Sequence, residues 1–294
     1  MNFHFDIIVV NEHHGAGFNL CIYVKLKYYN LDGGYMENLK PINRSLIRIY
    51  FGKKYYRIKR YKEWFFSNKK FALKKEVSVL KHVVFTHKSL LHRELKDVEM
   101  WLQHNKVKNL NIATKAINKI IIRPGETFSY WRLIGNTTRR KGYVEGMILH
   151  YGKVTVGVGG GLCQLSNLIY WMTLHTPLTV SERYRHSYDV FPDSNRKQPF
   201  GSGATCYYNY LDLQIKNETT NTYQLVLYLT DTHLVGEWRS DSPSIKTYEV
   251  YEAEHKISLE YWGGYVRQNR IHRKIFDGND VQIGDEYITE NNAI

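Results

Sequence analysis

The hydrophobic pattern is clearest in the stretch that follows position 163. Apolar residues recur there at the i, i+3, i+4, i+7 spacing of a helix face packed on a core: Leu165, Leu168, Ile169 and Met172. The residue before a proline disfavours the α conformation, so Thr176-Pro177 should end this helix. The pattern therefore predicts a mostly buried helix that begins near Cys163.

Two further helices are indicated upstream. Residues 105–122 carry apolar side chains at helical spacing, namely Val107, Leu110, Ala113, Ile117 and Ile120. A shorter amphipathic helix is suggested by Leu46, Ile49, Tyr50 and Lys53. Both lie before the central helix in the chain.

Most of the remaining chain reads as strands separated by polar turns. Residues 143–149 and 153–158 flank His150-Tyr-Gly152 like a hairpin, and residues 248–288 alternate throughout. Shorter strands are expected over residues 7–10, 21–24, 83–85, 127–131, 178–183, 205–209, 211–216, 223–229 and 234–238. We therefore predict an α+β fold, with a largely antiparallel sheet packed on a buried central helix that carries a cysteine at its N-terminus.

The same pattern suggests four regions. Residues 1–35 form an N-terminal extension, which is open to question because Met36 is an equally good start. Residues 36–110 form a basic, aromatic-rich region. Residues 111–240 hold the central helix, and residues 241–294 form a β-rich C-terminal extension.

Composition describes a folded, aromatic-rich protein. Of the 294 residues, 43% are hydrophobic, and 24 are tyrosine and 12 phenylalanine. No transmembrane span or export signal is visible in the sequence, which predicts a protein of the cytoplasm. Nothing in the sequence sets an oligomeric state.

The formal charge of +13 predicts an anionic partner, which leaves acidic wall polymer, lipid headgroups and nucleic acid open. Cations and aromatic residues alternate from Arg44 to Lys75. One interpretation is a surface for an anionic membrane or wall polymer, and another is a site for single-stranded nucleic acid, which we consider unlikely. The alternative is a solvated basic face whose aromatic side chains turn into the core.

Cys163 is the candidate nucleophile. Gly159, Gly160 and Gly161 precede it and allow the backbone a left-handed conformation or a close approach to a ligand. A cysteine in the first turn of a helix has its thiol pKa lowered by unpaired N–H groups, which could also stabilise an oxyanion. The alternatives are a small buried hydrophobic residue and a simple turn. No lysine follows the glycines, so the run does not match a P-loop.

A cysteine nucleophile needs a base, and His186 is the best placed of the thirteen histidines. It follows the strand after the central helix, so the chain can return beside Cys163. His150 lies at the hairpin tip and His175 at the far end of the helix. The alternative for His186 is a hydrogen-bonded structural imidazole. The three cysteines, Cys21, Cys163 and Cys206, form no disulfide framework or zinc-type pair, so we expect no metal and no cofactor.

Four motifs, taken in order, resemble the VanW domain family. They are Arg123-Pro-Gly-Glu-Thr-Phe-Ser-Tyr-Trp131, Gly159-Gly-Gly-Leu-Cys-Gln-Leu-Ser166, His186-Ser187, and Ala204-Thr205 through Leu211-Asp-Leu-Gln-Ile-Lys-Asn217. The resemblance is strong over residues 112–236. It implies a link to vancomycin resistance and cell-wall peptidoglycan, and some secreted members act as L,D-transpeptidases through the cysteine of this motif.

Carried over, the resemblance makes Cys163 the nucleophile on a peptidoglycan stem peptide or precursor and His186 its base. The backbone around Leu162 to Gln164 would stabilise the oxyanion, with help from the Gln164 amide, in a loop that runs from Gly159 to Ser166. Members commonly have Asp-Ala-Thr where this chain has Gly203-Ala204-Thr205, so the carboxylate that would orient His186 is missing. Asp189 or Asp212 is the expected substitute.

Two classes of function remain open. The first is a cysteine acyltransferase that forms 3-3 cross-links. This chemistry would place the protein in the cell envelope, which conflicts with the lack of an export signal and leaves the location open. The second is a non-catalytic accessory module that binds cell-wall peptide, an anionic envelope surface or a partner protein.

Overall fold

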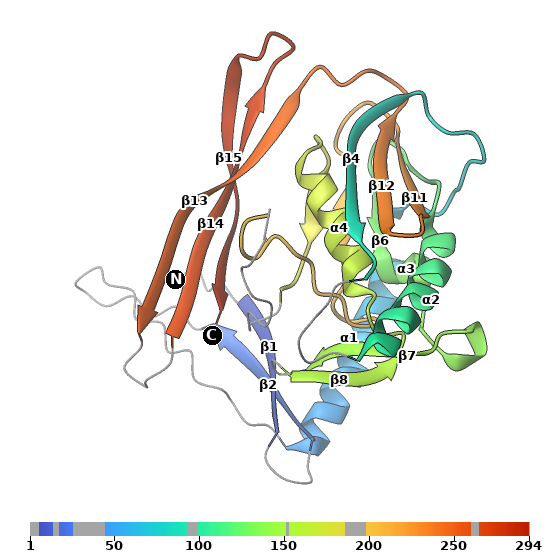
Figure 1. Cartoon of the computed structure of the whole chain (residues 1–294), viewed down its shortest axis with the longest axis vertical. Coiled ribbons are helices and arrows are strands. Elements are labelled where there is room, and N and C mark those ends of the chain that lie inside the picture. The colour runs from blue at the N-terminus through green and yellow to red at the C-terminus, as the bar shows by residue number, and fades with distance from the viewer. Residues whose placement is uncertain are drawn as a thin grey trace.

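The computed structural model describes residues 6–13, 18–25, 45–92, 99–150, 153–185, 198–259 and 265–293. His186 and Asp189 lie outside these ranges. The described chain is a mixture of helices and mainly antiparallel sheets, which confirms the predicted α+β fold (Figure 1).

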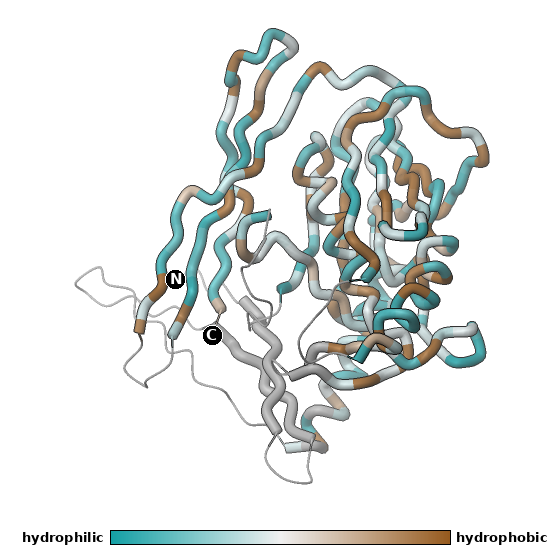
Figure 2. The backbone as a smooth tube through the Cα atoms, in the orientation of Figure 1, coloured by the Kyte–Doolittle hydropathy of each residue, from teal (hydrophilic) through white to brown (hydrophobic). Residues whose placement is uncertain are grey.

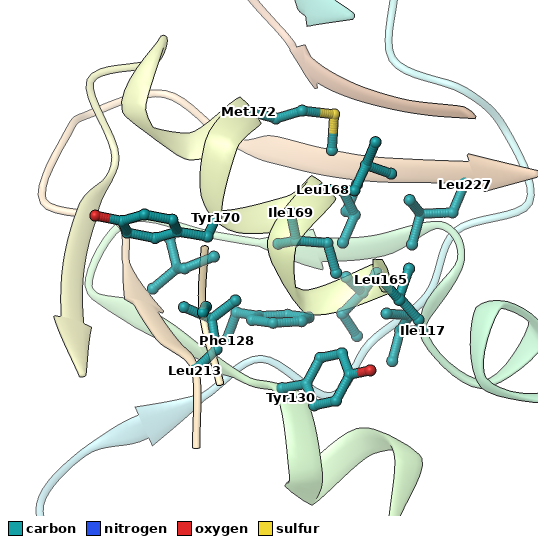
Figure 3. Packing of buried hydrophobic residues seen from close by; sticks show 14 of the residues in the cluster. Ile117, Phe128, Tyr130, Leu165, Leu168, Ile169, Tyr170, Met172, Leu213 and Leu227 are labelled. Carbon is teal, nitrogen blue, oxygen red and sulfur yellow. The ribbon is translucent and has the colours of Figure 1, made fainter. Parts of the chain in front are cut away.

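The central helix α4 (Cys163–Leu174) begins at the cysteine as predicted. Nine of its side chains are buried, and the seven apolar ones among them form one core cluster with residues such as Phe128, Leu213 and Leu227 (Figure 3). His175 follows the helix as its C-cap residue, and Pro177 comes two residues later. The prediction of a buried helix carrying Cys163 at its amino end is confirmed.

Two four-stranded sheets accompany this helix. The first is fully antiparallel, in the order β4 (His82–Leu90), β12 (His233–Ser240), β11 (Tyr223–Leu229) and β5 (Ile120–Ile122). The second has the order β3 (Lys70–Phe71), β6 (Glu126–Ser129), β10 (Gln214–Lys216) and β9 (Thr179–Glu182). Within it only the short β3–β6 pair is parallel. Helix α4 contacts β4, β12 and β9, so it touches both sheets.

Helix α2 (Met100–Ile117) packs against β11 and against the hairpin of β7 (Glu145–His150) and β8 (Lys153–Val158). This hairpin was predicted. The inclusion of Ile120 in the helix was wrong, because the backbone turns at Lys119, which has a φ of 63°. Ile120 then starts strand β5, where it pairs with Leu225.

Two predicted strands were wrong in part or whole. Residues 127–131 divide between β6 and the short helix α3 (Tyr130–Ile134), because the Ser129 hydroxyl accepts a hydrogen bond from the Arg132 N–H and caps that helix. Residues 205–209 form no strand, and only an isolated bridge joins Tyr207 to Leu211. In contrast, the predicted short helix near Leu46 is the 21-residue helix α1 (Leu46–Phe66).

The chain ends in a separate antiparallel sheet of β13 (Thr247–Leu259), β14 (Tyr265–Phe276) and β15 (Gln282–Ala293). It lies beside the main body and is mostly hydrophilic (Figures 1 and 2). Arg273 on β14 donates to the carbonyl oxygen atoms of Leu174 at 3.2 Å and Thr176 at 2.8 Å, which ties this sheet to the end of α4.

The predicted strands over residues 7–10 and 21–24 are confirmed as β1 (Asp6–His13) and β2 (Phe18–Lys25), which pair antiparallel. The short 3-10 helix η1 (Arg139–Lys141) follows α3 in the chain. Among the helices that the structure describes, none has both the length and the apolar character needed to cross a membrane.

Candidate functional site

The glycine loop before Cys163 is shaped by close backbone packing. Gly159 and Gly161 have φ angles of 79° and 89°, in the left-handed region that favours glycine. Gly160 lies against the backbone of strand β7, where an added Cβ would come within 2.2 Å of the carbonyl group of Gly146. The loop therefore requires glycine for two reasons. Gly159 and Gly161 adopt left-handed conformations, and Gly160 lies in close contact with β7.

Asn109 on helix α2 fastens this loop. Its amide donates to the carbonyl oxygen of Gly160 at 2.9 Å and to that of Val144 at 3.0 Å. Its own amide oxygen accepts from the Val144 N–H at 2.9 Å. The side chain is fully buried, so these bonds fix the loop relative to α2 and to the residues that precede β7.

A second set of bonds holds the first turn of α4. The hydroxyl of Tyr130 donates to the carbonyl oxygen of Leu162 at 3.0 Å. The hydroxyl of Ser166 contacts the carbonyl oxygen of Ala204 at 2.7 Å and that of Cys163 at 3.2 Å. The N–H of Ala204 donates to the Asn167 amide oxygen at 2.8 Å. These hydrogen bonds hold the segment around Ala204 against the start of α4, and we call this segment the strap.

This strap brings Cys206 next to Cys163, and both are free thiols with partly exposed residues. The Cys163 thiol accepts hydrogen bonds from the backbone N–H groups of Cys206 and of Cys163 itself. Ser166 forms a side-chain hydrogen bond with Cys206. The two sulfur atoms thus share one small polar environment at the amino end of α4.

Burial raises the pKa of the Cys163 thiol, and the two backbone hydrogen bonds offset this effect only in part. This differs from the lowered pKa that the helix position predicts. The physical reason is that the sulfur lies largely within the protein, where the charged thiolate loses its hydration. The pKa of Cys206 is raised further, by burial and then by the nearby charge of Asp212.

Gln164 does not direct its amide toward the sulfur. The amide nitrogen donates to the Ser89 hydroxyl at 2.8 Å and to the Leu90 carbonyl oxygen at 2.7 Å, both at the end of β4. The Gln164 N–H donates to the Gly161 carbonyl oxygen at 3.2 Å. The oxyanion role predicted for this amide therefore has no support in the observed geometry, where the side chain connects α4 to β4.

Asp212 lies fully buried at the start of helix α3. Its carboxylate accepts hydrogen bonds from the N–H groups of Trp131 at 2.9 Å and Leu213 at 3.0 Å, and from the Ser129 hydroxyl at 2.5 Å. Burial, followed by the charge of Glu182, raises its pKa to about 7. These contacts assign Asp212 a part in holding the junction between β6 and α3, next to the Cys206 thiol.

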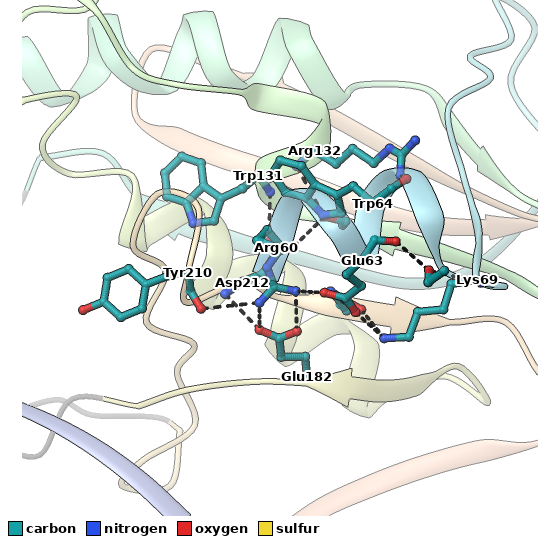
Figure 4. Close-up of polar contacts among 12 residues, drawn as sticks. Arg60, Glu63, Trp64, Lys69, Trp131, Arg132, Glu182, Tyr210 and Asp212 are labelled. Atoms are coloured by element: carbon teal, nitrogen blue, oxygen red, sulfur yellow. Dashed lines mark hydrogen bonds and ion pairs between the residues drawn. The ribbon is translucent and has the colours of Figure 1, made fainter. Parts of the chain in front are cut away.

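Arg60 of helix α1 joins this group from the outside. Its guanidinium forms a two-pronged ion pair with Glu182, with one contact of 2.7 Å, and contacts Glu63 at 2.5 Å (Figure 4). Burial acts to lower the pKa of Arg60, but Glu182 outweighs it and the pKa is raised. The ion pair between Arg60 and Glu182 fixes α1 against strand β9 and against the chain that runs up to Asp212.

The chain that leads to His186 is described as far as Arg185. The carbonyl oxygen of Tyr184 accepts from the Thr205 N–H at 2.8 Å, one residue from Cys206. Arg183 donates to the Gly203 carbonyl oxygen at 2.9 Å. His175 lies at the other end of α4, stacked on Phe85, as the helix geometry predicted.

The sequence did not predict the part that several residues play in this site. Asn109 and Tyr130 lie in segments whose apolar pattern hides their polar contacts, although an asparagine within a helical apolar pattern is an available signal. Cys206 was noted only as one of three scattered cysteines. Among the described residues, no group of three histidine, cysteine or acidic side chains could hold a metal ion.

The geometry defines a class of protein with a cysteine at the amino end of a buried helix, approached through a glycine loop. A family described as VanW like protein matches residues 105–239. The chain is 36% identical over 186 residues to the Vancomycin B-type resistance protein VanW of Enterococcus faecalis, which covers 63% of this chain and 68% of that protein. It is also 33% identical over 110 residues to the Uncharacterized protein YoaR of Bacillus subtilis, covering 37% of this chain and 35% of that one.

The chain therefore belongs to the VanW family, as the sequence motifs indicated. The name of the Enterococcus faecalis relative links this family to vancomycin resistance. No solved structure matches the chain.

Proposed function

We propose that this protein is a cysteine acyltransferase that forms 3-3 cross-links between peptidoglycan stem peptides. The observation that carries the proposal is the position of Cys163, a free and partly exposed cysteine that opens a buried helix directly after a tightly packed glycine loop. A cysteine used only for packing needs no such loop and no hydrogen bonds to its sulfur.

The backbone supplies the second part of the proposal. Backbone hydrogen bonds from Cys163 and Cys206 act on the Cys163 thiol and lower its pKa against the effect of burial. In the proposed reaction the same two N–H groups would serve the carbonyl oxygen of an acyl group carried by the sulfur. Donors in this position stabilise the oxyanion of a tetrahedral intermediate. The strap, which Ser166 and Asn167 bind, holds the Cys206 N–H in place.

The raised pKa of Cys163 means that the thiol is protonated near neutral pH, so the reaction needs a base. His186 follows Tyr184 by two residues, and two residues of extended chain span about 7 Å at most. The Tyr184 carbonyl oxygen is hydrogen bonded to Thr205, the residue before Cys206. The short length of chain between Tyr184 and His186 therefore supports His186 as the base.

In the first step, His186 takes the thiol proton and the sulfur attacks the carbonyl carbon of the third residue of a stem tetrapeptide. The bond from that carbon to the nitrogen of the terminal D-Ala breaks, and the leaving amine takes the proton from His186. An amine on the third residue of a neighbouring stem then attacks the thioester, its proton passes through His186, and the thiol is restored. Cross-links made from a tetrapeptide donor do not require the D-Ala-D-Ala terminus that vancomycin binds, which fits the link to resistance.

The proposal is tested by release of D-Ala from a synthetic stem tetrapeptide in the presence of an acceptor amine. We expect Cys163→Ala and His186→Ala each to remove the activity, and Cys206→Ala to keep a measurable part of it, because only its N–H has a role. Urea unfolding of each variant checks that the fold is intact.

Activity that persists in a folded Cys163→Ala variant would refute the proposal. The proposal would also be refuted if the wild-type protein released no D-Ala and the Cys163→Ala variant bound the stem peptide as the wild type does. That second result would instead support a non-catalytic accessory module.

A further inference from the structure

Helix α1 exposes an unusual number of large apolar side chains. Ile47, Phe51, Ile58 and Phe65, which we call the apolar ridge, are between 56% and 71% exposed. The helix faces the body of the protein with a different set, in which Arg60 and Trp64 are buried and Tyr56 and Glu63 partly so. Because the ridge residues are exposed, they do not turn into the core, which was one interpretation of the aromatic residues in this basic region.

The ridge residues lie on one side of the helix. At about 100° per residue, the four positions fall within an arc of about 40°, on the side away from Tyr56 and Arg60. The 21 residues of α1 span about 31 Å. The ridge runs from Ile47 to Phe65, about 27 Å along the axis, and a straight row of apolar side chains is suited to a flat partner.

The flanks of the ridge carry tyrosines and cations. Tyr50, Tyr55 and Tyr61 are exposed beside it, and Lys54 lies 4.6 Å from the centre of the Tyr50 ring. The helix holds seven cations and one acid, Glu63, which is already bound by Arg60 and Lys69. The cations are Arg48, Lys53, Lys54, Arg57, Lys59, Arg60 and Lys62.

We propose that the outer face of α1 binds the surface of an anionic lipid bilayer. The apolar ridge enters the boundary between headgroups and acyl chains, the tyrosines lie at headgroup level, and the flanking cations pair with lipid phosphates. The opposite face of the helix holds the protein, because Arg60 binds Glu182 and contacts the carbonyl oxygen of Tyr210.

A second copy of the protein fits this face less well. Two α1 helices packed ridge to ridge would bring their flanking lysines and arginines together, and the like charges would repel. An anionic bilayer instead offers both apolar depth and opposite charge. The inference is independent of the proposed chemistry, since among the described residues neither the apolar ridge nor the flanking cations contact the Cys163 loop.

The test is flotation of the full chain with vesicles of equal parts phosphatidylglycerol and phosphatidylcholine, compared with vesicles of phosphatidylcholine alone. We expect binding to the anionic vesicles only, weakened by raising the salt from about 50 mM to about 500 mM. The variant Phe51→Glu/Ile58→Glu should lower the partition coefficient at least about tenfold. Lys54→Gln/Lys62→Gln, which keeps the ridge, should also lower it by about tenfold or more.

The matched control is Val77→Glu/Ile257→Glu, which places the same charges at exposed apolar positions outside α1 and should bind as the wild type does. All the substituted side chains are exposed, so each variant should retain the wild-type urea midpoint. Equal binding to both kinds of vesicle, or an equal loss in the control, would overturn the proposal. A dimer in sedimentation velocity that Phe51→Glu/Ile58→Glu dissociates would also overturn it, and would assign the ridge to self-association.

Discussion

The close packing of Gly160 against Gly146 gives a prediction of stability that can be worked from the structure. An added Cβ at Gly160 would lie 2.2 Å from the carbonyl carbon and oxygen of Gly146 and 2.7 Å from the N atom of Met147. These atoms belong to the backbone of strand β7 and cannot move as a flexible side chain can. Gly160→Ala must therefore shift the glycine loop or the strand.

Overpacking of this kind costs about 1–3 kcal/mol, and Asn109 adds to the cost because its hydrogen bonds to Gly160 and Val144 depend on the same spacing. We therefore expect Gly160→Ala to lower the free energy of unfolding by about 3 kcal/mol. Gly52→Ala is the matched control. Gly52 lies within helix α1 with nothing within 4 Å of an added Cβ, so alanine should stabilise the protein by about 0.5–1 kcal/mol.

The measurement is urea unfolding followed by tryptophan fluorescence, since Trp131, Trp171 and Trp238 are buried and report loss of the core. The two substitutions add the same methyl group, so opposite shifts of the midpoint isolate the effect of the contact. Surface substitutions usually change the free energy of unfolding by no more than about 0.5 kcal/mol. A change of that size or smaller in Gly160→Ala would show that the loop does not depend on this packing.

Two other predictions concern the buried charges beside the site. Because the pKa of Asp212 is raised to about 7, the folded state binds more protons than the unfolded state between about pH 4 and pH 7, and stability falls as the pH rises through this window. This group alone contributes a loss of about 4 kcal/mol, and Asp212→Asn should flatten the pH dependence in urea titrations; an unchanged slope would contradict the raised pKa. Arg60→Met should lower the free energy of unfolding by about 3 kcal/mol, because Glu182 and Glu63 lose their buried cation. Arg57→Met on the exposed side is its control, and equal effects in the two variants would mean that the ion pair with Glu182 contributes nothing specific.

Apolar patterns were enough to predict the central helix and strand β11, in which most side chains are buried, and the hairpin before the helix, where two apolar runs flank a polar tip. Element ends depended on features that periodicity does not carry. Ile120 continues the helical spacing of α2, yet the left-handed Lys119 turns the chain and pairing with Leu225 makes it a strand residue. In the same way the Ser129 cap turns the end of β6 into helix α3.

The candidate site was predicted in part for similar reasons. The glycine loop and Cys163 are consecutive in sequence, so the motif shows them together. Asn109, Tyr130 and Cys206 reach the same place from distant segments, and only the tertiary fold brings them there. The thiol pKa also depends on burial, which the position of a cysteine at a helix end does not determine.

The measurement that tests the nucleophile most directly is the intact mass of the protein after mixing with a stem tetrapeptide and no acceptor amine. We expect an adduct equal to the tetrapeptide minus D-Ala, located on Cys163 by peptide mapping and sensitive to hydroxylamine, as a thioester is. An unmodified protein, or an adduct carried by Cys206 and retained in Cys163→Ala, would contradict the assignment of Cys163.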